Sequence, residues 1–333
     1  FITQMALALQ ALVLAALTFF GQITIWQIYI LTAVQASAMA FDLPARQSLV
    51  PNLVPRDILP SAFSLNTIAF NVGAIGGPLF FGLIPEGGQG LAYLLNSISF
   101  LAVIAALFFM GDVPQNVNKA GGVNLSAMWD GVQFIFKRPL ISSTMLMDFI
   151  ATFFASANTM LPIVARDILN VGKTGFAWLT SAEAIGSVVA GLVVSQFPKL
   201  RKQGLMFFAS VFAFGLATIL FGFSKTFGLA MIALFLVGTG DAVSTVIRNT
   251  IRQLQTPDHI RGRMTSVNQI FFMGGPQLGE VEAGLVAAAF GVPFSIVSGG
   301  IGCIVGLILV VWKWPQLVHY DGHETLPAPA TAD

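Results

Sequence analysis

The stretch RQSLVPNLVPRDILPSAFSLNTIAFNVGAIGGPLFFGL (residues 46–83) aligns without a gap onto RNTIRQLQTPDHIRGRMTSVNQIFFMGGPQLGEVEAGL (residues 248–285), at an offset of 202 residues. Eleven of the 38 aligned positions are identical. Apolar residues match easily by chance, so the polar and glycine identities are the informative ones. They are Arg46/Arg248, Ser64/Ser266, Asn66/Asn268, Gly73/Gly275, Gly77/Gly279 and Gly82/Gly284. The chain therefore contains an internal repeat that relates a first half to a second half.

The composition is that of a chain embedded in a lipid bilayer. Charged residues make up 9% of the 333 residues, hydrophobic residues make up 56%, and the mean hydropathy is +0.81. Soluble chains contain about 25% charged residues, so a polytopic membrane protein is predicted. The net charge of +1 argues against nucleic acid as a partner, because that partner requires a basic face. One cysteine and three scattered histidines predict neither a disulfide framework nor a metal site.

Ten apolar runs reach the length of about 20 residues that a spanning helix needs. They lie at 1–20, 23–41, 62–84, 90–110, 140–161, 176–197, 204–223, 228–247, 265–289 and 292–312. If the loop at 42–61 is cytoplasmic, thirteen Lys and Arg residues lie inside and three lie outside. This positive-inside bias predicts an all-α protein with a cytoplasmic C-terminus.

The repeat also predicts how the two halves are built. The spans at 140–161 and 176–197 have no counterpart, because their partners would precede residue 1. We therefore expect an N-terminally truncated chain, with ten of twelve transmembrane helices present. The expected domains are an N-terminal half with the third to sixth helices, a cytoplasmic linker, a six-helix C-terminal half and a cytoplasmic tail, at 1–110, 111–139, 140–314 and 315–333. Within the linker, LSAMWDGVQFIF (125–136) has apolar residues at helical spacing, which predicts an amphipathic helix on the inner membrane surface.

Two loop regions carry a resemblance to a known family. The segment FDLPARQ at 41–47 is followed by LVPR at 53–56, and Pro257-Asp258 is followed by RGRM at 261–264. With Asn66, these residues resemble the major facilitator superfamily, in particular the bacterial branch of the enterobactin exporter and macrolide-type efflux proteins. The resemblance covers essentially the whole chain. It implies the major facilitator fold of two pseudo-repeat halves, with the substrate bound between them near the midplane.

One helix motif points to the direction of transport. Gly73, Gly77, Pro78 and Gly82 resemble the glycine-proline signature of proton-driven exporters, with Phe81 where that signature usually has another glycine. Small residues four positions apart allow two helices to approach closely, and a proline inside a helix removes one hydrogen bond and bends it. The alternative is a packed helix interface without any role in direction.

Ionisable side chains inside spanning helices are costly unless they are paired or hydrated, so each is a candidate functional group. The candidates for proton coupling are Glu280, Glu183, Asp148 and Glu282. Glu280 is preferred, because it lies near the middle of its span and the repeat places it opposite Pro78. Burial would keep it protonated until a cavity opens to water. The alternative for each acid is a structural hydrogen bond to a neighbouring helix.

The gate arginines and the two cavity candidates Asn66 and Asn268 are predicted from equivalent positions in the two halves, and the remaining cavity candidates would suit a large, partly aromatic substrate. Arg46 and Arg248 occupy equivalent helix ends at the inner surface, and Asp241 lies seven residues before Arg248, so that the two can share one helix face. This predicts an inner-gate ion pair, with a solvated helix end as the alternative. Candidates for lining the cavity are Asn66, Asn268, Phe153, Phe154 and Asn158. Packing in the core or against lipid is the alternative for the phenylalanines.

The sequence predicts a transporter and no enzyme. It contains neither a phosphate-binding glycine loop with its lysine nor an HExxH motif. A proton-coupled secondary exporter of amphipathic small molecules of the drug or siderophore type, working by alternating access, is expected. An importer, a facilitator, or a non-transporting receptor or assembly protein of the same fold remains open. We expect a monomer in the bacterial cytoplasmic (inner) membrane, with a small-molecule substrate and the bilayer as partners and with no cofactor besides the proton gradient.

Overall fold

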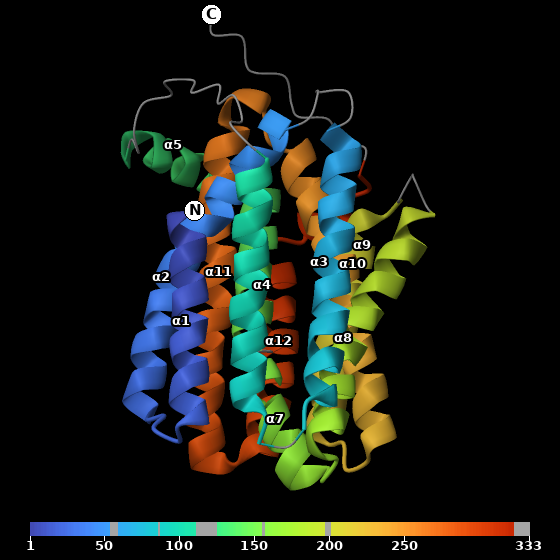
Figure 1. The fold of residues 1–333 in the computed structure, drawn as a ribbon. Coiled ribbons are helices and arrows are strands. Elements are labelled where there is room, and N and C mark those ends of the chain that lie inside the picture. Colours follow the sequence, from blue (N-terminus) through green and yellow to red (C-terminus); the bar gives the residue numbers. More distant parts are fainter. Residues whose placement is uncertain (54–58, 86, 111–124, 155–156, 197–200, 323–333) are drawn as a thin grey trace, which may run out of the picture. The chain divides into compact units, whose positions relative to one another are not determined.

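The computed structural model describes residues 1–333 except 54–58, 86, 111–124, 155–156, 197–200 and 323–333. The described residues form helices and no strands. The chain divides into two compact units, residues 1–120 and residues 121–333. In Figure 1 the helices of the first unit run from blue to cyan, and those of the second from green to red.

The described residues of the first unit form four long helices. They are α1 (Ile2–Phe19), α2 (Ile25–Leu53), α3 (Leu59–Leu83) and α4 (Gln89–Phe109). Helix α1 packs against both α2 and α4. A buried hydrogen bond from the Ser97 hydroxyl to the Ala8 carbonyl, 2.9 Å long, joins α4 to α1. The polar group of Ser97 is thus satisfied within the apolar contact, as burial requires.

The second unit is the larger of the two. Its long helices are α5 (Leu125–Phe136), α6 (Pro139–Phe154), α8 (Gly172–Ser195), α9 (Gln203–Gly222), α10 (Phe227–Leu254), α11 (Asp258–Phe290) and α12 (Val292–Lys313). Short helical pieces are η2 (Ala157–Met160), α7 (Leu161–Ile163), η3 (Val164–Ile168) and α13 (Gln316–His319). Helix α10 packs against α8, α9 and α6, while α12 packs against α9 and α6. Helix α11 packs against α6, α12 and α5.

All ten predicted spans coincide with helices, although their boundaries shift. Among the described residues, six helices are long and apolar enough to cross a bilayer, namely α1, α4, α8, α9, α10 and α12. The predicted amphipathic helix at 125–136 has the bounds of α5. The largest shift is at the end of the span predicted at 23–41, because α2 continues to Leu53 through part of the loop predicted at 42–61. The span predicted at 140–161 is described as α6 to Phe154 and as short helical pieces from Ala157 to Ile168. Pro162 lies at the start of α7, and a proline cannot donate the hydrogen bond that would continue a regular helix through it.

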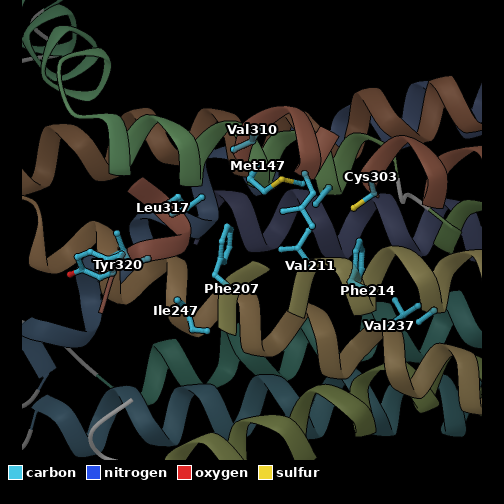
Figure 2. Packing of buried hydrophobic residues seen from close by; sticks show 14 residues of the cluster. Met147, Phe207, Val211, Phe214, Val237, Ile247, Cys303, Val310, Leu317 and Tyr320 are labelled. Carbon is cyan, nitrogen blue, oxygen red and sulfur yellow. The ribbon is translucent and has the colours of Figure 1, made fainter. Parts of the chain in front are cut away.

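The core of the second unit reaches into the segment that follows α12. Figure 2 shows Leu317 and Tyr320 beside Phe207 and Ile247 in one apolar cluster. Leu317 and Tyr320 are both 1% exposed. The backbone N–H of Gly204 donates a 2.9 Å hydrogen bond to the Tyr320 carbonyl. The chain from α13 to Tyr320 is therefore part of the packed bundle.

Glycines bring the backbones of α8 and α10 into close contact. A Cβ atom built on Gly186 would lie 2.1 Å from the Phe235 carbonyl oxygen, and one on Gly238 would lie 1.9 Å from that of Glu183. The Ser187 hydroxyl donates to the Gly238 carbonyl at 3.0 Å. The Thr239 hydroxyl lies 2.9 Å from the Phe235 carbonyl of its own helix and 3.3 Å from the Gly186 carbonyl of α8. Small residues and hydroxyl bonds of this kind hold helices together in membranes.

Replacing Gly186 with alanine should destabilise the protein by about 1–3 kcal/mol, because the added methyl group meets backbone that cannot move aside. Gly191→Ala is the matched control, since it lies in the same helix and its added Cβ meets no atom within 4 Å. That control should be neutral or slightly stabilising, because alanine favours helix more than glycine does. Thermal unfolding of both variants in detergent tests this. Equal melting temperatures would contradict the close contact.

Candidate functional site

A buried carboxylate is shared by two arginines in the second unit. Asp148 on α6 is 1% exposed, and its Oδ1 and Oδ2 atoms each lie 3.2 Å from an arginine Nη2, of Arg248 and Arg252 respectively. The two arginines are four residues apart on α10, so they lie on one helix face and point at the same partner. Both are 3% exposed. These three residues, together with Thr144, are called the Asp148 cluster below.

Further hydrogen bonds fix the two guanidinium groups. Arg252 donates to the Thr144 carbonyl at 2.9 Å and to the Thr144 hydroxyl at 3.3 Å. Arg248 donates to the Ser244 hydroxyl at 3.2 Å. Oδ1 of Asp148 accepts no hydrogen bond from the described residues. Its contact with Arg248 is therefore an ion pair without a hydrogen bond. Arg252 is therefore the better-anchored of the two arginines.

Arg248 also reaches toward a second, more exposed carboxylate. Its Nη2 atom lies 3.5 Å from Oδ1 of Asp241, whose side chain is 46% exposed. The hydroxyl of Thr245 lies 3.4 Å from the same oxygen. The structure thus brings the predicted pair of Arg248 and Asp241 together, and adds Asp148 as a buried third member. Arg248 links a carboxylate inside the unit to one at its surface.

The equivalent arginine of the first unit has a related arrangement. Arg46 forms an ion pair with Asp42, four residues earlier on α2. Asp42 is buried and accepts hydrogen bonds from the Thr3 hydroxyl at 2.9 Å and from the Gln4 amide at 2.7 Å, both on α1. The repeat offset of 202 residues places Ser244 opposite Asp42. Each arginine thus contacts the side chain four residues before it, within its own unit.

The other predicted acids lie on α8 and α11, which carry none of these arginines. Glu280 and Glu282 are on α11, where the Glu280 side chain is exposed and that of Glu282 is half-buried. Glu183 is half-buried on α8, and its backbone forms part of the contact with α10. Asp148 differs from all three, because protonating it would deprive two buried guanidinium groups of their shared counter-ion.

The exporter-like motif lies on α3, with Pro78 inside the helix. A Cβ atom built on Gly73 or Gly77 would meet no atom within 4 Å. Close helix packing within the first unit therefore does not require glycine at these two positions. Gly82 is half-buried near the end of the same helix.

The predicted cavity-lining residues have different surroundings. Asn268 on α11 is half-buried, and its Oδ1 atom is buried without a hydrogen-bond partner among the described residues. Phe153 stacks on Phe149 with ring centroids 5.8 Å apart, and Phe154 packs against the core cluster of the second unit. The side chains of Asn66 and Asn158 lie outside the described part of the structure.

Sequence reasoning missed Arg252 and Thr144 as members of the site. The span predicted at 228–247 ended at the last apolar residue, which placed Arg252 in a loop. In the structure α10 continues to Leu254. The charged side chain of Arg252 can lie inside the bundle there because Asp148 and Thr144 on α6 pair with it. The available signal was the spacing of Arg248 and Arg252, four residues apart on one face of a helix.

Comparison with known proteins identifies relatives over most of the chain. The transmembrane secretion effector family matches residues 1–330. The enterobactin exporters EntS of Shigella dysenteriae serotype 1 (strain Sd197) and Escherichia coli (strain K12) are 22% identical over 307 residues, covering 92% of this chain and 73% of each relative.

Solved structures share the fold at low sequence identity. A POT family transporter in complex with a thioalcohol-conjugated peptide superposes with a TM-score of 0.71 at 13% identity, covering 95% of this chain and 82% of the other. A bacterial homologue of the human lysosomal transporter Spinster has a TM-score of 0.66 at 13% identity, with coverage of 95% and 82%. The Escherichia coli fucose:proton symporter FucP has a TM-score of 0.54 at 14% identity, with coverage of 94% and 82%.

Proposed function

The chain belongs to the transmembrane secretion effector family, a family of major facilitator transporters, and from this membership we propose that it exports amphipathic small molecules. The most direct support for export is the similarity to enterobactin exporters, which extends over 92% of the chain. Enterobactin is a siderophore, so the proposed substrates are of the siderophore or lipophilic drug type. The family and the structural neighbours are transporters and not enzymes.

The proposed energy source is the proton gradient. The described residues form helices with short connections, and no phosphate-binding loop occurs in the sequence. A secondary transporter must then couple export to an ion. Glu280 is the proposed proton carrier, because it lies near the middle of its predicted span and opposite Pro78 in the repeat. The burial expected for it is not found, since its side chain on α11 is exposed. Glu183, Glu282 and Asp148 are the remaining candidates.

The proposed mechanism is alternating access, with gates at the helix ends that carry Arg46 and Arg248. Arg248 is supported in this role by its position between buried Asp148 and exposed Asp241. Exchange of one carboxylate for another would let its helix end move while the guanidinium group keeps a counter-ion. The thirteen-to-three distribution of basic residues supports an inner-membrane orientation with a cytoplasmic C-terminus.

Proton-driven transport can be measured in proteoliposomes with a catecholate siderophore and a macrolide as probes. A proton antiporter accumulates the probe when the vesicle lumen is acidic, because protons leave as the probe enters. A symporter accumulates it when the outside is acidic, and a facilitator only equilibrates it. We expect accumulation with an acidic lumen, abolished by a protonophore. Accumulation only with an acidic exterior would identify an importer and overturn the proposal.

A further inference from the structure

Helix α5 is firmly packed against two helices of the second unit. Ile135 is 4% exposed and shares a core cluster with Ile141, Met145, Met264 and Val267 of α6 and α11. A Cβ atom on Gly131 would lie 3.2 Å from the Arg263 carbonyl oxygen. In Figure 1, α5 runs across the direction of the long helices of the second unit. An amphipathic helix held in this way lies where membrane surface and bundle meet.

A pocket of about 370 Å³ lies where α5, α6, α11 and α12 meet. Its lining is almost entirely apolar. It includes Val132, Met145, Leu146, Val267, Phe271 and Trp314. The Ser142 hydroxyl, the one lining hydroxyl, already donates to the Ile135 carbonyl. The pocket therefore suits an acyl chain rather than a polar ligand.

One cation without an acidic partner lines this pocket, and two more follow the lining residue Phe136 in the sequence. Lys313 lines it, with an exposed side chain whose Nζ atom lies 4.6 Å from the centroid of the Trp314 ring. Lys137 and Arg138 fall in sequence between the lining residues Phe136 and Pro139. Within the described part of the chain, none of these three cations forms an ion pair. Their charge remains available for an external anion.

We propose that this pocket binds an anionic phospholipid, with one acyl chain against Leu146 and Phe271 and the headgroup phosphate at Lys313 and Lys137. Basic pockets between membrane helices bind anionic headgroups, and each nearby cation contributes attraction. The apolar lining binds the chain of any phospholipid, so the cations determine the preference for an anionic one. This site is independent of the proposed export function.

Fluorescence of Trp314 offers a direct test, because this residue lines the pocket. A variant with Trp26, Trp129, Trp178 and Trp312 replaced by phenylalanine retains Trp314 alone. It is reconstituted with brominated phosphatidylglycerol or brominated phosphatidylcholine, each diluted in unlabelled phosphatidylcholine. Brominated phosphatidylglycerol should quench Trp314 at several-fold lower mole fraction. A variant that retains only Trp178, on α8, is the control and should be quenched equally by both lipids.

Two substitutions separate the headgroup from the chain. Lys313→Gln should reduce the preference for phosphatidylglycerol about fivefold, whereas Lys225→Gln, at an exposed position between α9 and α10, should not change it. Leu146→Phe should reduce quenching by both lipids because it fills the pocket. Native mass spectrometry of the chain with all its tryptophans gives a second readout, the retention of phosphatidylglycerol. Equal quenching of Trp314 by both lipids, with no retained lipid, would overturn the site.

Discussion

Asp148→Asn should lower the free energy of unfolding by about 3–5 kcal/mol, because it leaves two buried guanidinium groups without their shared counter-ion. Asparagine has nearly the same shape as aspartate, so the expected loss comes from charge rather than from a cavity. The two ion-pair distances of 3.2 Å and the 1% exposure of Asp148 support this magnitude. Unfolding of the purified protein by a denaturing detergent measures it.

The matched control is Asp167→Asn, which removes the acid of an exposed ion pair with Arg166 in the same unit. Exposed pairs contribute little to stability, so this variant should unfold like the unmodified protein. The double variant Asp148→Asn/Arg252→Gln should be more stable than the two single effects together predict, because removing one cation relieves the excess charge. An Asp148→Asn protein as stable as the Asp167→Asn control would show that the stability of the Asp148 cluster does not depend on charge pairing.

Glu280→Gln should abolish uphill export while downhill equilibration of the substrate continues. Glutamine resembles the protonated acid and cannot release a proton, so the transport cycle would lose its coupling and keep its conformational change. The pH dependence of transport should become flat for the same reason. Proteoliposomes with and without an imposed proton gradient measure both effects, using the probes described for the export assay.

Glu282→Gln is the internal control, because Glu282 lies on the same helix but has a different environment, half-buried rather than exposed. A milder effect is expected from it. If Glu280→Gln still accumulates substrate against its gradient, the proton-carrying role passes to Glu183 or Asp148. Of these two, Glu183 would be preferred, because Asp148 is already the counter-ion of two arginines.

The sequence by itself determined the membrane class, the repeat and most helices. Apolar runs of about 20 residues reflect the thickness of the bilayer. Such a run consists of consecutive residues, so it can be recognised without knowing the tertiary structure. The amphipathic pattern at 125–136 correctly predicted the bounds of α5, because helical periodicity depends only on nearby residues. The motifs at 41–47 and 261–264 were sufficient to predict the family, and the family match over residues 1–330 confirms that prediction.

Tertiary structure alone decided which residues share the buried carboxylate of Asp148. Arg252 and Asp148 are 104 residues apart, and nothing local to either one indicates that α6 and α10 place them in contact. The hydropathy of the sequence predicted that this helix ends at residue 247. In the structure α10 continues past Arg252, because that arginine pairs with a carboxylate on a neighbouring helix. The pairing of a buried charge is a property of the packed bundle, because the cost of burial depends on which groups surround it.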